Sequence, residues 1–221
     1  MVLFGATGMV GTGVLLACLD DRRVESVLSV SRTPTGLTHA KFREIIHSDF
    51  FDYTSIRDDL VGVDACFFCL GVSAFRKDER TYHRLTYDLT MAAAESLCDL
   101  DPEMTFCYVS GVGTDASEHG RVMWARVKGK TENQLLRMPF KAYMFRPGYI
   151  HPVKGARSKT RLYRAFYQIT GPLYPLLKRV AGQHITTTDA LGRAMIEVAV
   201  NGYPRQVLYN EDINTLAHEQ A

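Results

Sequence analysis

The stretch of sequence that decides the fold is GATGMVG, at residues 5–11. A short apolar run, residues 1–4, precedes it, and residues 10–19 follow with apolar side chains at helical spacing, so the glycines lie in a turn between a strand and a helix. Glycine permits the tight turn, a close approach of the backbone to a phosphate, and close packing of the helix on the strand. The N–H groups and partial positive charge at a helix N-terminus attract anions. We therefore expect a pyrophosphate to lie against Gly5, Thr7, Gly8, Met9, Val10 and Gly11.

The alternation of strand and helix patterns continues along the chain. Residues 65–70 are apolar throughout, which is typical of a strand buried on both faces. Such alternation predicts the α/β class, with a doubly wound, mostly parallel sheet covered by helices on both faces. We expect strands at residues 1–4, 27–30, 42–47, 65–70, 105–109, 141–145 and 206–209. We expect helices at residues 10–19, 79–97, 121–136 and 188–201.

Composition restricts the class of protein. The chain has 221 residues, 46% hydrophobic and 23% charged, which is ordinary for one globular domain over residues 1–221. The formal net charge of +2, from 26 basic and 24 acidic residues, favours no nucleic-acid partner. No apolar run approaches the roughly 20 residues that cross a bilayer, so no integral membrane contact is expected.

Cysteine usage indicates a reducing compartment. The five cysteines have no framework spacing, and reduced thiols together with the lack of a signal peptide predict a cytoplasmic location. Cys66 and Cys69 form a C-x-x-C pair, but both lie in the apolar run at residues 65–70. We expect them to be buried strand thiols that point to opposite faces.

The end of the second expected strand indicates which cofactor binds. NAD-binding sites of this type carry an acidic residue there for the ribose hydroxyls, whereas an arginine accommodates the 2′-phosphate of NADP. This chain has Val30-Ser31-Arg32-Thr33 and no acid. We expect Arg32 to pair with the phosphate, helped by the hydroxyls of Ser31 and Thr33, and so expect NADP, with NAD possible if Arg32 faces solvent.

Further motifs follow the other expected strands and the helix at residues 121–136. They are Asp49-Phe50, Leu70-Gly71-Val72, Val109-Ser110-Gly111-Val112-Gly113, Val127-Lys128-Gly129-Lys130-Thr131-Glu132, Arg146-Pro147-Gly148 and TDALGRAM at residues 188–195. With the glycine turn and Arg32, they resemble the short-chain dehydrogenase/reductase superfamily over essentially the whole chain. More narrowly, they are similar to its atypical branch of small epimerase-like and NmrA-like NAD(P)-binding proteins. The resemblance implies a Rossmann fold, with the strands in the order 3-2-1-4-5-6 and strand seven at an edge. It also adds these cofactor-binding residues: Asp49, Phe50, Leu70, Gly71, Val72, Lys128, Pro147 and Gly148.

The resemblance also implies catalytic positions, and one of them departs from the pattern. Catalytic members carry a Ser after strand five and a Tyr-x-x-x-Lys on the next helix, where the Tyr moves a proton while the nicotinamide moves a hydride. Ser110 and Lys128 match, but Trp124 stands at the Tyr position. An indole N–H donates a hydrogen bond and is no proton acid near neutral pH.

Three interpretations of this departure stay open. Another group supplies the proton: Tyr149, His119, Asp115, Tyr82, His83 or a water held by Ser110. Alternatively, the chain is a non-catalytic NADP(H)-binding regulatory or interaction protein. In the third interpretation, Trp124 packs over the nicotinamide and shapes a site for unrelated chemistry. We favour an NADP-dependent oxidoreductase or sugar-nucleotide-epimerase-like enzyme that acts on a small carbonyl or hydroxyl substrate, as a monomer or homodimer, with no metal.

The C-terminal third changes in composition. Residues 151–184 contain three prolines and many aromatic side chains. In relatives with this fold the chain after the sixth strand builds a substrate lid, so we expect a small C-terminal lobe with the lid at about residues 151–187. We expect a helix in this stretch to cover the sheet edge, with the basic side chains of residues 157–179 in water. The alternatives are that these side chains bind an acidic substrate or dock on a membrane surface.

Overall fold

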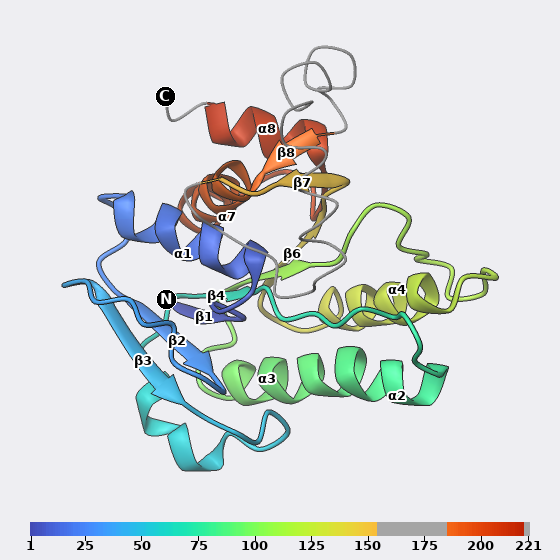
Figure 1. Ribbon diagram of the computed structural model, residues 1–221, viewed down its shortest axis with the longest axis horizontal. Coiled ribbons are helices and arrows are strands. Elements are labelled where there is room, and N and C mark those ends of the chain that lie inside the picture. The colour runs from blue at the N-terminus through green and yellow to red at the C-terminus, as the bar shows by residue number, and fades with distance from the viewer. Residues whose placement is uncertain (154–184, 219–221) are drawn as a thin grey trace.

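In the computed structural model, which describes residues 1–153 and 185–218, one parallel sheet lies between two layers of helices (Figure 1). The seven strands are ordered β3-β2-β1-β4-β5-β6-β9, and each neighbouring pair is parallel. The expected fold class and strand order are therefore confirmed, with the last strand at an edge. The strands are β1 Val2–Phe4, β2 Val27–Ser31, β3 Phe42–Ile46, β4 Ala65–Phe68, β5 Thr105–Val109, β6 Lys141–Arg146 and β9 Val207–Tyr209.

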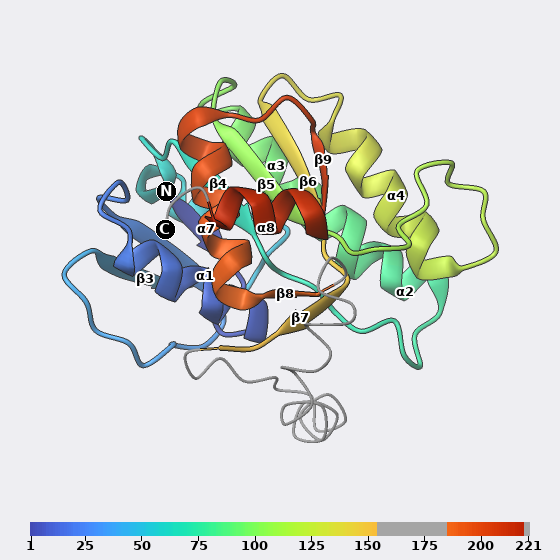
Figure 2. The same ribbon diagram turned by 90° about the horizontal axis from the view of Figure 1, so that it is seen from above.

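Helices cover both faces of the sheet, as Figure 1 and Figure 2 show. The helix α1 lies on one face with α7 and α8, and the helices α2, α3 and α4 lie on the other. Phe67 belongs to the core under α1 and α7, whereas its neighbour Phe68 belongs to the core under α3 and α4. Both faces of β4 are therefore buried, which explains its unbroken apolar run. The helices are α1 Met9–Asp20, α2 Glu79–His83, α3 Leu89–Cys98, α4 Met123–Leu135, α7 Thr188–Asn201 and α8 Asn210–His218, with short turns η1 Thr54–Ile56 and η2 Asp58–Leu60.

One expected helix is interrupted. The helix expected at residues 79–97 consists of α2, a π-helical turn η3 (Arg84–Asp88) and α3. Within the junction, the Thr90 hydroxyl donates to the Thr86 carbonyl at 2.6 Å. Apolar spacing does not reveal a turn widened by one residue, because the same face of the helix stays buried on either side.

The C-terminal part contains elements that the sequence patterns did not predict. A second, two-stranded parallel sheet pairs β7 (Tyr149–His151) with β8 (Ile185–Thr187). The helix α8 follows β9, where we had expected the chain to end with a strand. Of the lid expected at residues 151–187, only the ends are described. Residues 154–184, with their basic and aromatic side chains, and residues 219–221 lie outside the described residues.

The cysteines are free thiols, as expected. Cys66 is fully buried and Cys69 is partly exposed. Burial raises the pKa of both thiols above the ordinary value. A redox-active pair needs a low pKa to form a thiolate, so this C-x-x-C is not one.

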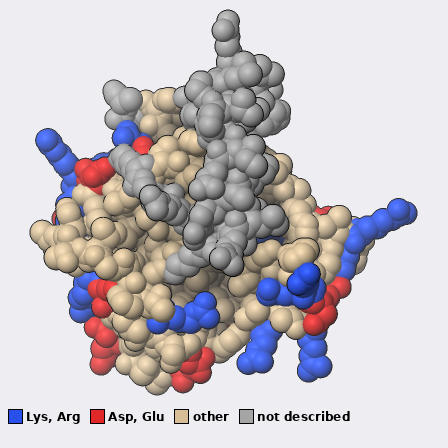
Figure 3. Space-filling view, viewed as in Figure 1, with Lys and Arg blue, Asp and Glu red and all other residues tan. Residues whose placement is uncertain are grey.

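Charged side chains of both signs are spread over the face shown in Figure 3. Among the described residues on that face, Lys and Arg side chains stand beside Asp and Glu side chains.

Candidate functional site

The site lies where the carboxyl ends of the parallel strands meet at one edge of the sheet. From β1 the chain continues to β2 and β3 on one side, and β4 lies on the other side of β1. Such a reversal of strand order creates a crevice outside the strand ends, where ligands of open α/β sheets bind. The glycine turn, Arg32, Leu70-Gly71-Val72, Ser110 and Pro147-Gly148 each follow one of these strands.

The glycine turn has the geometry that the sequence predicted. A Cβ on Gly5 would lie 2.8 Å from the backbone of Cys69, and one on Gly11 would overlap the Gly5 carbonyl. Gly5 also has a φ of +87°, in the left-handed region. Gly8 is the N-cap of α1, and no side chain caps this helix. The first N–H groups of α1 therefore have no partner within the helix and face the crevice end of β1.

The loop after β2 presents Arg32. Arg32 is exposed, and the Glu44 carboxylate fixes the loop by accepting a hydrogen bond from the Thr35 N–H at 3.0 Å. The buried Ser31 hydroxyl donates to the Thr33 carbonyl at 2.7 Å. Ser31 thus shapes the turn instead of extending toward a ligand, and Arg32 provides the positive charge.

The remaining cofactor positions differ in their exposure and contacts. The Asp49 carboxylate accepts a hydrogen bond from the Phe51 N–H at 3.0 Å, and Phe50 is buried. Gly71 is exposed, and a Cβ there would meet nothing within 4 Å. Pro147 and Gly148 make hydrogen bonds to other segments. The Pro147 carbonyl accepts a hydrogen bond from the Val112 N–H at 2.9 Å, and the Gly148 N–H donates one to the Asn210 side chain at 2.8 Å.

The helix α4 brings three of its residues to the end of β5. Trp124, Lys128 and Glu132 are spaced by four and therefore share one face of the helix. The Lys128 amine donates a hydrogen bond to the Ser110 carbonyl. The Trp124 ring lies beside Gly113 in the loop that Ser110 begins: a Cβ at Gly113 would be 3.3 Å from its Cη2 atom. The structure thus brings Ser110, Lys128 and Trp124 to one loop.

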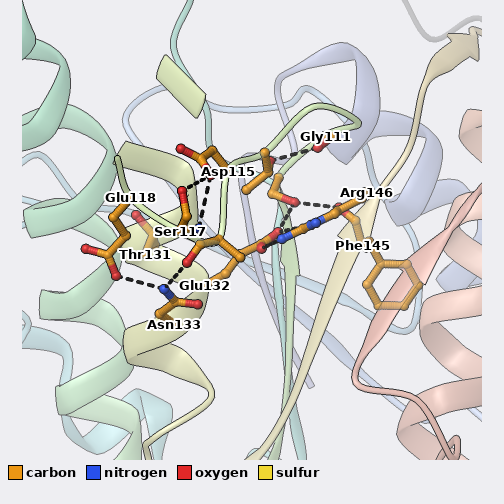
Figure 4. Close-up of polar contacts among 12 residues, drawn as sticks. Gly111, Asp115, Ser117, Glu118, Thr131, Glu132, Asn133, Phe145 and Arg146 are labelled. Carbon is orange, nitrogen blue, oxygen red and sulfur yellow. Dashed lines mark hydrogen bonds and ion pairs between the residues drawn. The ribbon is translucent and has the colours of Figure 1, made fainter. Parts of the chain in front are cut away.

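A buried ion pair lies beneath these residues, and sequence reasoning had assigned it no role. Glu132, only 1% exposed, binds the Arg146 guanidinium through both oxygens, with Nε at 3.0 Å from Oε1 and 3.1 Å from Oε2 (Figure 4). The Ser110 hydroxyl donates to Glu132 Oε1 at 2.5 Å. Arg146 also donates to the Tyr209 hydroxyl at 3.0 Å. The spacing of four from Lys128 was the available signal for Glu132, but nothing in the sequence joins it to Arg146.

The electrostatics of the site single out Lys128. The residue as a whole is partly exposed, but its amine nitrogen is surrounded by protein atoms. Desolvation by this burial lowers the pKa of Lys128 from 10.5 to about 8, against a weaker opposing effect of the Glu132 carboxylate. A proton is therefore exchangeable at this amine near neutral pH.

Three of the alternative proton donors are ionised, buried or paired with another side chain. Hydrogen bonds from Ser117 and Gly120 hold the pKa of Asp115 below its usual value, so its carboxylate stays charged. Tyr82 is 2% exposed, and burial raises its pKa. His83 pairs with Asp88 at 3.2 Å, away from Ser110 on α2. Of the remaining candidates, His119 is an exposed loop residue and Tyr149 lies on β7.

A separate hollow of about 700 Å³ opens at the opposite edge of the sheet. Its lining includes Met1, Val27, Phe42 and Ala65, which stand at the amino ends of their strands. It therefore lies away from the glycine turn. In residues 1–153 and 185–218, no group of three or more His, Cys, Asp or Glu side chains is placed to hold a metal ion.

The fold places the chain in a structural class. Solved structures similar to it are short-chain dehydrogenase/reductase proteins and related epimerases, so the resemblance is confirmed at the level of the fold. WbmF of Bordetella bronchiseptica, solved with NAD⁺, covers 99% of this chain and 77% of its own at a TM-score of 0.67 and 15% identity. The match to UDP-glucuronic acid 4-epimerase of Bacillus cereus, solved with NAD, covers 94% of this chain and 76% of the epimerase, at a TM-score of 0.65 and 15% identity.

Among curated proteins, the chain is similar to fungal proteins named FMP52. FMP52 of Debaryomyces hansenii is 26% identical over 162 residues, covering 72% of this chain and 69% of that protein. Fmp52 of Aspergillus niger is 24% identical over 222 residues, covering 94% of this chain and 89% of that protein. No family model matches the chain.

These relatives correct one expectation. All three curated relatives, including fmp52-1 of Aspergillus terreus, are named as mitochondrial proteins, and this finding overturns the cytoplasmic location inferred from the cysteines. Reduced thiols do not distinguish one reducing compartment from another. Across the described parts of the chain, no helix has both the length and the apolar character to cross a membrane.

Proposed function

We propose that this protein binds a nicotinamide dinucleotide at the carboxyl edge of its sheet and prefers NADP(H). We further propose that it catalyses oxidoreductase or epimerase-like chemistry on a small carbonyl or hydroxyl substrate. The observation that carries the proposal is the glycine turn at an uncapped helix N-terminus, where a Cβ at Gly5 or Gly11 would collide with backbone. The solved relatives that contain NAD add support from the fold.

The residues around the crevice suit the parts of a dinucleotide. The N–H groups of Met9, Val10 and Gly11 suit the pyrophosphate, and the exposed Arg32 suits a 2′-phosphate. Gly71 leaves open space beside the chain after β4. Further contacts are proposed through Asp49, Phe50, Leu70, Val72, Lys128, Pro147 and Gly148.

The dinucleotide, when bound, supplies a hydride donor or acceptor for the substrate carbon. Lys128 and Ser110 then act at the substrate end of the crevice, since Lys128 binds the Ser110 carbonyl where β5 ends. Trp124 contributes an apolar wall, with its ring beside Gly113. The substrate class remains a small molecule with a carbonyl or hydroxyl group.

The variant Gly8→Asp separates dinucleotide binding from folding. Gly8 has a φ of −88°, and a Cβ there would be 3.3 Å from the Gly5 carbonyl, so the backbone accepts a side chain with a small shift. Aspartate is a better N-cap than glycine by a few tenths of a kcal/mol, so we expect unchanged or raised thermal stability. Its carboxylate occupies and repels the pyrophosphate space, so we expect NADPH affinity to fall at least 100-fold, about 2.7 kcal/mol.

Calorimetric titration with NADPH, paired with thermal unfolding, measures both effects. Gly8→Asn is the matched control, because it caps the helix and adds similar volume without the charge. Binding of NADPH to Gly8→Asp with unchanged affinity would contradict the proposed site. Lack of binding by the unmodified protein would contradict the proposed function as a whole.

A second function, from another class, is a dinucleotide-binding regulatory or interaction protein without turnover. The observation that favours it is Trp124, which stands where the resemblance implies the proton-transferring Tyr. The two functions differ in one measurement: a regulatory protein binds NADPH but does not oxidise it with a panel of aldehydes and diketones.

A further inference from the structure

We propose that Lys128 is the proton donor and acceptor of this site, and that the buried Glu132–Arg146 ion pair keeps the Lys128 amine free of a carboxylate partner. The proposal rests on the proposed function, because the proton moves only with dinucleotide and substrate in place. It assigns to the lysine the step that Trp124 cannot perform.

The placement of Lys128 is the first argument. Trp124, Lys128 and Glu132 succeed one another along one face of α4, from the loop at Gly113 to the buried ion pair. Lys128 stands between them, with its amine on the Ser110 carbonyl at the carboxyl end of β5. This is the edge where the strand ends converge on the crevice.

Ser110 is not available as a donor to substrate. Its hydroxyl carries one proton, which it donates to Glu132 at 2.5 Å, and the residue is 7% exposed. The oxygen of Ser110 offers only lone pairs to other groups while this bond lasts. A substrate oxygen that needs a proton must therefore receive it from another group at this edge, and Lys128 is the adjacent one.

Among the described residues Lys128 has no carboxylate partner, and the Glu132–Arg146 pair explains why. Glu132 lies one helical turn from Lys128, which is the usual spacing for an ion pair on a helix. Both of its oxygens are instead engaged by Arg146, and one also accepts from Ser110. The attraction of Glu132 for the ammonium is therefore offset by the adjacent guanidinium charge.

Other titratable groups packed near α4 are engaged elsewhere or buried. Arg126 binds Glu79 of α2 at 2.7 Å, and His83 of α2 lies 3.2 Å from Lys130. The phenols of Tyr82 and Tyr108 are buried, and burial raises the pKa of each. Among the described groups, Glu132 is the one whose charge acts on Lys128, and desolvation outweighs it. The resulting pKa of about 8 makes the amine able to give and regain a proton.

The step balances without a further reactant. In the reductive direction, the substrate carbonyl carbon accepts a hydride from the reduced nicotinamide dinucleotide, and its π bond opens onto oxygen. That oxygen takes a proton from the Lys128 ammonium, whose N–H electron pair stays on nitrogen as a neutral amine. The amine regains its proton from water. In the oxidative direction, the substrate carbon gives its hydride to the oxidised dinucleotide while the neutral amine accepts the proton of the substrate hydroxyl, which it then releases to water.

Two measurements test the proposal, and the first needs no turnover. In protein labelled with ¹³C at the lysine ε carbons, the Lys128 signal is assigned by its loss in Lys128→Arg and followed from pH 6 to 11. We expect a midpoint near 8. In Arg146→Lys the two-pronged contact with Glu132 is lost, so we expect the midpoint to rise by one unit or more.

The second measurement is NADPH oxidation with 4-nitrobenzaldehyde and 2,3-butanedione. The guanidinium of Lys128→Arg keeps the charge but does not deprotonate. We expect it to lose turnover at saturating NADPH by about 100-fold or more, the usual contribution of a general acid. The exposed Lys130→Arg is the matched control, and we expect its rate to equal that of the unmodified protein.

The outcomes separate this proposal from the proposed function. A Lys128 midpoint above 10, or a Lys128→Arg rate above half that of the unmodified protein, overturns the proton-donor role alone. NADPH binding without reduction of either probe overturns the proton-donor role and the proposed catalysis together, and leaves the dinucleotide-binding regulatory function. Failure of NADPH to bind at all overturns the proposed function and the proton-donor role together.

Discussion

Replacing Lys128 with methionine should change how the free energy of unfolding depends on pH. Burial lowers the pKa of Lys128 from 10.5 to about 8 in the folded protein. Below pH 8 both the folded and unfolded chains bind the proton, and above 10.5 neither does. Between these values only the unfolded chain binds it, so the folded state gains stability as the pH rises. Lys128→Met lacks this contribution.

The expected magnitude follows from the shift in pKa. Two and a half units correspond to about 3 kcal/mol, which the partial exposure of the side chain reduces to roughly 2. Urea unfolding at pH 7, 8, 9 and 10 measures the free energy of both proteins. Their difference is the informative quantity, because the buried thiols such as Cys18, whose pKa is raised to about 12, are common to both and cancel.

The free energy of unfolding of the unmodified protein, minus that of Lys128→Met, should increase as the pH rises from 8 to 10. Lys130→Met, a change at an exposed lysine on the same helix, is the control and should show no such trend. A difference that stays constant within about 0.5 kcal/mol, or moves the other way, would refute the argument. Lys128 would then carry its proton in the folded state up to the ordinary range.

Three other changes test separate parts of the site. Glu132→Ala leaves the nearly buried Arg146 guanidinium without its carboxylate, so unfolding should become easier by about 3–5 kcal/mol; calorimetry showing a loss below 1 kcal/mol would contradict the role of the pair. Arg32→Asp should reverse or erase a preference for NADPH over NADH, and equal affinities in the unmodified protein would refute the proposed selectivity. The fluorescence of Trp124, the sole tryptophan, should fall when NADPH binds, and Trp124→Tyr should raise the rate of carbonyl reduction. If calorimetry detects the NADPH complex but the fluorescence does not change, the ring lies away from the nicotinamide.

The strand order was predicted from the resemblance to proteins with a Rossmann fold, whereas the sequence by itself determined the strands of the sheet and the turn after β1. These follow from local patterns: unbroken apolar runs identify strands buried on both faces, and glycines at residues 5, 8 and 11 accompany the change from strand to helix. Spacing of four along α4 likewise places Trp124 and Lys128 on one face without knowledge of the fold. The elements missed were short or atypical, such as β7, β8 and the π-helical turn, for which a few residues carry no readable period.

Only the tertiary structure determined which side chains pair at the site and how far the pKa of Lys128 is shifted. Glu132 on α4 meets Arg146 on β6 and Ser110 after β5, and these contacts join segments that no local pattern connects. The sequence showed a lysine at the matching position, whereas its pKa depends on the atoms that displace water from its amine. Desolvation and ion pairing are properties of the packed neighbourhood, so the chemistry of Lys128 follows from the fold and not from its place in the chain.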